Sequence, residues 1–365
     1  MDFDFSEECR TFQEQVRRCA SASGGILAAR AVLEGGQLYA ADLYADLARL
    51  GCLGAAIPEQ YGGLGLGYLH LCAASEALGA ELAPVPLSST VYLAAELILI
   101  AGSESQKAQW LPRIASGDVI ATLADVDEPG AACACAGERV SGAKAPVGDG
   151  MAADLAIVSA RKPGDADRLY LVNLGEAGVR RVTLRSIDPS RPQARVIFDA
   201  APCEPLGGGV SAASALDRAY DRAAILLAFE QLGGAEAALR AARDYAVERR
   251  TFGRPIGSYQ AIKHKLADVY MANQLARAHA YYGAWALDAG APELPRAAAG
   301  ARVAATDAFS LAAQENLQTH GGIGFTWEGD CQLYYRRARH LSLVIGSQGA
   351  WRNKLFDELS SQRRP

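Results

Sequence analysis

The sequence predicts an α+β protein in three parts: an N-terminal helical domain, a middle β domain and a C-terminal four-helix bundle. Apolar residues recur at helical spacing through both ends of the chain, whereas the segment between them consists of short runs rich in β-forming residues. The chain has 365 residues, half of them apolar, which is enough for a large core and for more than one domain. We place the domains at 1–118, 119–208 and 209–365.

The N-terminal domain is predicted to be all-α. Apolar residues recur at spacings of three and four in five segments: 5–20, 40–50, 68–82, 88–101 and 104–116. Residues 55–67, AAIPEQYGGLGLG, interrupt the helices with proline and glycine and are predicted as a loop. Ser103 and Gln106 have the spacing of a capping box, so the last of these helices is expected to begin there.

The middle domain is predicted to be a small β-barrel or sandwich inserted between the helical parts. Six short runs have β-strand character: VIATLADV, ERVSGAKAPV, DLAIVSAR, RLYLVNL, VRRVTLRSI and ARVIFDA. Gly, Pro, Asp and Asn residues separate them, as expected for turns between strands.

The C-terminal domain is predicted to be an up-down bundle of four long helices. The run SALDRAYDRAAILLAFEQLGGAEAALRAARDYAVERR is interrupted only by Gly233-Gly234, and its roughly 36 residues would span about 54 Å as a helix. Residues 259–289, 295–320 and 330–360 supply the other three helices. Long amphipathic helices with short connections favour an antiparallel bundle.

Composition excludes several classes of function. The net charge is −5 and no Lys/Arg run stands out, so nucleic acid is a poor candidate partner. No apolar run approaches the roughly 18 residues of a membrane span, and the acidic start MDFDFSEECRTFQEQ does not look like a signal peptide, so we expect a soluble cytoplasmic protein. The eight cysteines are scattered, with only Cys133 and Cys135 close together, which predicts reduced core thiols and no metal.

Four motifs stand out, of which the third and fourth are long and specific: IPEQYGGLGLG, QKAQWLPRIASGD, YAVERRTFGRPIGSYQAIKHKLADVY and QTHGGIGFTWEGDCQLYYRRAR. With them the chain resembles the acyl-CoA dehydrogenase family over nearly its whole length. The resemblance implies that family's fold and chemistry. FAD takes a hydride from Cβ of an acyl-CoA thioester while a glutamate removes the α-proton, which yields a 2,3-enoyl thioester.

The resemblance also implies one set of cofactor contacts. Seven residues match family positions that touch FAD across a subunit interface: Arg249, Thr251, Phe252, Gln260, Gln318, Gly321 and Gly322. Arg249 suits the pyrophosphate, because a guanidinium forms strong charge-assisted hydrogen bonds with phosphate oxygens. The two glycines suit close approach of the backbone to the adenosine half, because they carry no Cβ.

The residues with which family members bind a flavin within the same subunit are replaced in this chain. The family segment T-E-P-x-A-G-S-D corresponds to DVDEPGAACACAG, in which Cys133 and Ala134 replace the serine and the aspartate. On the next strand, Pro146 and Gly148 stand where the family places a stacking tryptophan and a threonine that hydrogen-bonds flavin N5. Proline lacks a large π face and glycine lacks any side chain.

The catalytic base is missing as well. Ile345 and Ala223 occupy the two positions at which family members carry the glutamate, and neither side chain can accept a proton. Asp221 and Glu230 are near Ala223 in sequence. However, two residues rotate about 200° around a helix, and Glu230 lies two turns, about 10 Å, along it. We interpret both carboxylates as solvated or interface side chains.

These departures from the family pattern lead to the hypothesis that two different subunits together form one active site. The chain is interpreted as the non-catalytic subunit of an α2β2 acyl-CoA dehydrogenase, sharing FAD with a homologous subunit that carries the glutamate. By analogy the substrate is a sterol- or bile-acid-derived acyl-CoA, with an electron-transfer flavoprotein as acceptor. Three alternatives stay open: an elimination or desulfination enzyme of the same fold, a scaffolding paralogue without flavin, and a homomeric dehydrogenase with an unrecognised base.

Overall fold

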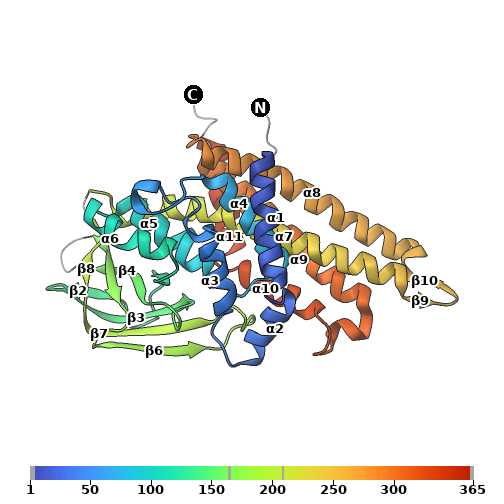
Figure 1. The fold of residues 1–365 in the computed structure, drawn as a ribbon, viewed down its shortest axis with the longest axis horizontal. Helices are drawn as coiled ribbons and strands as arrows, with labels where there is room; N and C mark the ends of the chain where they lie inside the picture. Colours follow the sequence, from blue (N-terminus) through green and yellow to red (C-terminus); the bar gives the residue numbers. More distant parts are fainter. Residues whose placement is uncertain (1–4, 163–165, 208, 362–365) are drawn as a thin grey trace. The chain divides into compact units, whose positions relative to one another are not determined.

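The computed structural model describes residues 5–162, 166–207 and 209–361. The chain divides into two compact units (Figure 1): unit 1 comprises Met1–Arg30, Tyr68–Ala83 and Ala224–Pro365, and unit 2 comprises Ala31–Gly67 and Pro84–Ala223. The helix α7 (Ala212–Glu248) and the helix α2 (Ile26–Glu34) each contribute residues to both units. The three-domain boundaries 1–118, 119–208 and 209–365 stay a prediction.

Unit 2 contains one mixed β-sheet. Its strands, all within the described residues, are β1 (Ala121–Ala124), β2 (Ala134–Ala136), β3 (Arg139–Gly148), β4 (Leu155–Arg161), β5 (Asp167–Asn173), β6 (Val179–Leu184), β7 (Gln193–Pro202) and β8 (Glu204–Pro205). Their order is β6-β7-β3-β2-β4-β5-β8, and β1 pairs in parallel with β4. All six predicted strands are confirmed. The other two, β2 and β8, span three and two residues, too short to produce a periodic pattern.

The register of β3, β7 and β6 decides which side chains share a face of this sheet. Ile197 of β7 lies opposite Ala143 of β3 and Arg180 of β6. Val196 lies opposite Lys144 on the other, buried face. Because side chains alternate along each strand, Ala143, Ile197 and Arg180 point to the same side of the sheet.

The helical part of unit 2 precedes the sheet. It comprises α3 (Ala41–Arg49), η1 (Cys52–Gly54), η2 (Glu59–Tyr61), η3 (Ser88–Ala95), α5 (Glu96–Ala101) and α6 (Glu104–Ala115). The capping box at Ser103 and Gln106 is confirmed, with both reciprocal hydrogen bonds present. The helix predicted over 88–101 begins instead as a π-helix, η3, in which every residue is buried. Every side of a buried helix is apolar, so the spacing of apolar residues in its sequence does not reveal how many residues form one turn.

Unit 1 is the helical bundle. It comprises α1 (Glu7–Ala22), α4 (Tyr68–Ala80), the end of α7, α8 (Gln260–Asp288), α9 (Leu294–His320), η5 (Gly321–Phe325), α10 (Cys331–Leu341) and α11 (Gln348–Ser361). Gly233 lies inside α7 and does not end the helix. Its role is in packing, because the missing side chain lets α7 approach α4 closely. A Cβ built on it would lie 2.0 Å from the carbonyl oxygen of Glu76 in α4. Gly79 of α4 has the reciprocal role, with a Cβ falling 2.0 Å from Glu230 O.

None of the eight cysteines, all of which lie within the described residues, forms a disulfide bond, and six of them are buried. In the part of the chain that the structure describes, no helix is long and apolar enough to cross a membrane.

Candidate functional site

A short hairpin follows α7 and presents the first group of predicted FAD contacts (Figure 1). Strand β9 (Arg250–Thr251) pairs antiparallel with β10 (Arg254–Pro255). The two residues between them, Phe252 and Gly253, have φ values of +53° and +81°. This is the left-handed geometry of a tight two-residue hairpin turn, and it directs the Phe252 side chain, which is 93% exposed, into solvent.

Arg249 is fixed by its backbone and leaves its side chain exposed. Its N–H donates to Tyr245 O (2.8 Å), and its carbonyl accepts from the N–H of Ile256 (2.8 Å). Among the described residues, none forms an ion pair or a side-chain hydrogen bond with the Arg249 guanidinium. An anchored backbone with an uncompensated, solvated cation suits contact with an external phosphate.

The second group of predicted contacts lies beside the base of this hairpin. The ring of Tyr245, at the end of α7, stacks on His320, at the end of α9, with centroids 4.1 Å apart. Gln318 is exposed, and Gly321 has a φ of +62°, which favours glycine. A Cβ on Gly322 would meet nothing within 4 Å in the described chain, so internal packing there does not require a glycine. The backbone of this loop is therefore open to a ligand.

Gln260 joins the same region through the start of α8. The Tyr259 hydroxyl, one residue earlier, donates to Thr251 O (3.0 Å), and the Arg254 guanidinium lies 4.0 Å from the Tyr259 ring centroid. Gln260 and Thr251 are both exposed. The structure thus brings all seven predicted contact residues to one end of unit 1, which we call the flavin-contact surface: Arg249, Thr251, Phe252, Gln260, Gln318, Gly321 and Gly322.

The first predicted base position, Ile345, lies in a turn held by buried contacts. The single helix predicted over 330–360 is wrong, because α10 ends at Leu341 and α11 begins at Gln348. Arg302 of α9, 1% exposed, donates to the carbonyls of Leu341 and Val344. Trp351 Nε1 donates to Ile345 O (3.1 Å), and Ile345 has a φ of +56°. This turn is a structural element that carries no proton-accepting side chain at Ile345.

The second base position, Ala223, is fully buried, and its neighbouring carboxylates are also inside the protein. Of the two interpretations of Asp221 and Glu230, as solvated or as interface side chains, the first is wrong, since they are only 3% and 5% exposed within the single chain. Glu230 lies 3.7 Å from the guanidinium of the buried Arg337. These carboxylates are buried because they lie on α7, which is buried on nearly all sides between residues 223 and 235. A carboxylate there is stable only with a partner.

The strands that would hold the chain's own flavin carry a different arrangement. Lys144, 1% exposed, pairs with Asp127 (Nζ–Oδ1 2.7 Å) and donates to Ser159 Oγ (2.9 Å). Pro146 is exposed, and Gly148 contributes only its carbonyl, which accepts from Thr122 Oγ1 (2.7 Å). These residues do not fit an isoalloxazine ring, because they offer neither an aromatic platform nor a side-chain donor at these two positions.

Cys133 replaces a family serine in the same region and is chemically quiet. Its N–H donates to Asp127 Oδ1 (2.9 Å), and its side chain is 2% exposed. Burial raises the pKa of the Cys133 thiol to about 11, so at neutral pH it is a protonated thiol and a weak hydrogen-bond donor.

Sequence reasoning missed the buried cations Arg302 and Lys144. Arg302 sits within AAAGARVAATDAF, so its position on the apolar stripe of α9 was the available signal. Burial lowers the pKa of Arg302 to about 10, and the charge of Glu230 opposes that shift. Lys144 precedes Pro146 by two residues on a β-strand, and no sequence pattern marked it as buried.

Comparisons with known proteins found two matching family models and several similar proteins. The family model "Acyl-CoA dehydrogenase, N-terminal domain" matches residues 6–118, and "Acyl-CoA dehydrogenase, C-terminal domain" matches residues 211–359. The acyl-CoA dehydrogenase IpdE2 of Mycobacterium tuberculosis is 35% identical over 343 residues, which cover 93% of this chain and 94% of that protein.

Two solved structures are similar over almost their full length. The ChsE4-ChsE5 complex from Mycobacterium tuberculosis contains a chain that is 27% identical with a TM-score of 0.90, and the match covers 100% of both chains. A variant of the Tcur3481-Tcur3483 steroid ACAD is 30% identical with a TM-score of 0.88, covering 98% of this chain and 99% of that one.

Proposed function

Since the chain belongs to the acyl-CoA dehydrogenase family, we propose that it is the base-lacking subunit of a heteromeric, FAD-dependent acyl-CoA dehydrogenase. A homologous partner subunit carries the catalytic glutamate, and this chain completes the partner's FAD site in an α2β2 assembly. One observation carries the proposal. Six of the seven residues of the flavin-contact surface are exposed and Gly321 is half-buried, whereas the resemblance places Ile345 and Ala223 at the two base positions.

The chemistry of α,β-desaturation explains why such a division works. FAD, when bound, supplies the hydride acceptor. The α-proton needs a carboxylate close to the α-carbon, and this chain offers only aliphatic side chains at both base positions. The diphosphate of the cofactor needs cations and backbone donors, and Arg249 with the 318–322 loop offers them. One subunit can therefore hold the nucleotide tail while the other performs the proton transfer.

A protein partner is also supported by apolar side chains exposed on unit 1. On α8, Tyr270, Met271 and Leu275 are 55%, 67% and 60% exposed, although each is large and apolar. Phe252 is exposed in the hairpin immediately before α8. Contiguous exposed apolar side chains are typical of protein–protein contact surfaces.

The substrate proposal rests on the relatives. The Tcur3481-Tcur3483 protein is a steroid ACAD, and two unlike chains are named for it and for the ChsE4-ChsE5 complex. We therefore propose a CoA thioester of a sterol or bile-acid side chain as the substrate. An electron-transfer flavoprotein stays the proposed acceptor of the electrons.

The test is co-expression with a glutamate-bearing homologue from the same genome, followed by an assay with a sterol side-chain acyl-CoA. We expect the two chains to co-purify and the complex to form the enoyl thioester. Replacing the partner's glutamate by glutamine should abolish turnover while the complex stays intact. Turnover that survives this replacement, or activity of this chain alone, would contradict the proposal.

A further inference from the structure

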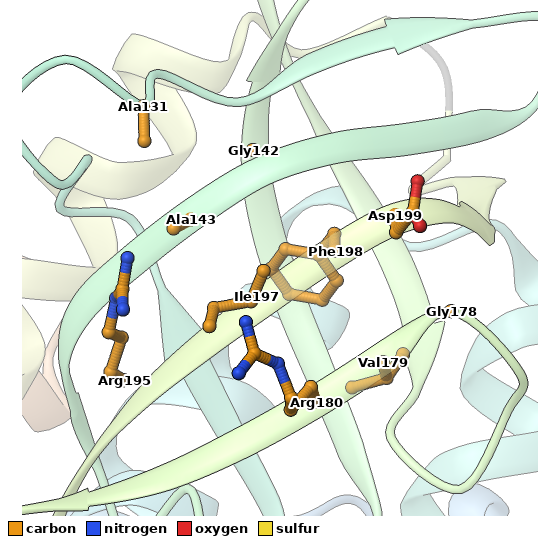
Figure 2. A pocket seen from close by; sticks show the side chains of 10 residues that line it. All are labelled: Ala131, Gly142, Ala143, Gly178, Val179, Arg180, Arg195, Ile197, Phe198 and Asp199. Carbon is orange, nitrogen blue, oxygen red and sulfur yellow. The ribbon is translucent and has the colours of Figure 1, made fainter.

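A second candidate site lies on the β-sheet of unit 2, apart from the flavin-contact surface. It is an open pocket of about 610 Å³ over strands β3, β7 and β6 (Figure 2). Ala143 and Ile197 form its apolar floor, and Arg180, Arg195 and Asp199 line its sides. This volume is within the range that holds a small organic ligand.

Two arginines face this pocket together because of the strand register. Ile197 lies opposite Arg180, and Arg195 is two residues before Ile197 on the same strand, so both arginines share one face of the sheet. Such diagonal neighbours are roughly 7–8 Å apart, within reach of long side chains. Figure 2 shows the two guanidinium groups on either side of Ile197 and Asp199 at the far end of the pocket.

One of the two arginines in this pocket is paired and the other is not. Arg195 pairs with Glu128 (2.6 Å). The Arg180 side chain has no ion-pair or hydrogen-bond partner among the described residues, and it is exposed. Like charges that are neighbours on one face of a sheet destabilise it. An anion placed between the two guanidinium groups would remove this repulsion and accept several charge-assisted hydrogen bonds.

We propose that this pocket binds a phosphorylated small molecule. A phosphate group lies between Arg180 and Arg195, because its oxygens can accept from both planar guanidinium groups at once. The uncharged part of the ligand lies on Ala143 and Ile197. A phosphomonoester and a diphosphate would both satisfy this chemistry. The site shares no residue with the flavin-contact surface, so it is independent of the proposed dehydrogenase function.

The test is calorimetric titration of the full chain with inorganic pyrophosphate at physiological salt, repeated with phosphoserine to separate diphosphate from monoester. We expect saturable binding that Arg180→Gln and Arg195→Gln each weaken about tenfold or more, the loss of roughly 1.4 kcal/mol from one charged contact. Arg185→Gln is the matched control. Arg185 is exposed just beyond β6, lies outside the pocket and should leave binding unchanged.

A second measurement separates this pocket from the flavin-contact surface. Arg180→Gln should leave the flavin content of the complex unchanged. Circular dichroism checks that each variant is folded, and Arg180→Lys, which keeps the charge, should restore part of the affinity. The proposal is overturned by the absence of saturable binding, by equal weakening in Arg185→Gln, or by binding that disappears only in Arg249→Ala.

Discussion

At the residue scale, the guanidinium of Arg249 has the most direct proposed role. It is exposed beside the open 318–322 loop, and within the described residues it lacks a counter-ion. We expect Arg249→Ala to reduce the flavin content of the purified complex several-fold, because a charge-assisted phosphate contact contributes about 1.5–3 kcal/mol. Flavin absorbance after denaturation, divided by protein concentration, measures this.

Arg243 provides the control for that experiment. It is 64% exposed on α7, the helix that ends just before Arg249, and pairs with the adjacent Asp244 (2.6 Å). Arg243→Ala should leave flavin content unchanged. If both variants lose flavin equally, or if neither does, Arg249 has no specific part in the site.

Phe252 shows how a locally unfavourable residue points to a role outside the chain. A non-glycine residue at φ +53° is strained, and its phenyl ring is 93% exposed. Phe252→Asn should stabilise the isolated chain by about 1 kcal/mol, because asparagine tolerates this conformation. The same change should weaken association with the partner. Urea unfolding measures the first effect, and Phe252→Leu, which keeps the strain, should show no stabilisation.

At the scale of elements, we propose that the turn between α10 and α11 distinguishes this chain from a self-sufficient enzyme. Ile345→Glu should fold, since the turn is held through the backbone by Arg302 and Trp351. We expect no acyl-CoA dehydrogenase turnover from this variant alone, because Pro146 and Gly148 still provide no flavin platform. Measurable turnover by the purified single variant would show that the loss of the base was the only defect.

The pair formed by Lys144 of β3 and Asp127, which precedes β2, leads to a prediction about how stability depends on pH. Burial alone would raise the pKa of Asp127, but hydrogen bonds from Lys144 and from the Cys133 N–H outweigh it and lower that pKa. A lowered carboxylate pKa adds stability that is present above the unfolded value of about 3.9 and is lost as pH falls through the folded value. The contribution is therefore complete at neutral pH and disappears in acid.

Asp127→Asn should accordingly destabilise the protein by about 3 kcal/mol at pH 7, because it leaves the buried Lys144 without its carboxylate. The variant should also lose stability less steeply than the wild type below about pH 4. Asp167→Asn breaks an exposed pair with Arg161 and should cost less than about 1 kcal/mol. Denaturant unfolding across pH would contradict the account if the two variants behaved alike.

The same elements show what sequence patterns can and cannot predict. Six strands were predictable because their apolar and β-branched runs are bounded by turn residues. The break in the helix at Ile345 was not predictable, because apolar spacing continues across 330–360. The break depends on Arg302, a distant residue on α9. The burial of Glu230 was missed for the same reason. Its partner Arg337 lies more than a hundred residues away in the sequence.

At the scale of the whole molecule, the proposed function places half of the candidate site on a second chain. The resemblance to a family predicts which residues contact the flavin, and these residues lie at one end of unit 1. In the proposed assembly, the groups that lie opposite them belong to a second polypeptide, which no pattern in this sequence describes. The pocket over Arg180 and Arg195 was also missed, because strand register across β6 and β7 is a tertiary property.

The exposed face of α8 provides a test of assembly. Met271→Asp and Leu275→Asp should leave the chain folded, since both side chains are already largely exposed, but should prevent co-purification with the partner. Leu27→Asp, at a position that is 62% exposed on α2, is the matched control and should not affect assembly. Size-exclusion chromatography of co-expressed chains distinguishes these results. Retention of the complex by both α8 variants would place the interface elsewhere.

The most direct measurement is the flavin stoichiometry of the purified protein, with and without a glutamate-bearing homologue. The account predicts a colourless chain when it is expressed alone, and a yellow complex with about one FAD per pair of unlike chains when it is co-expressed. A yellow assembly of this chain alone that oxidises an acyl-CoA would contradict the division of labour.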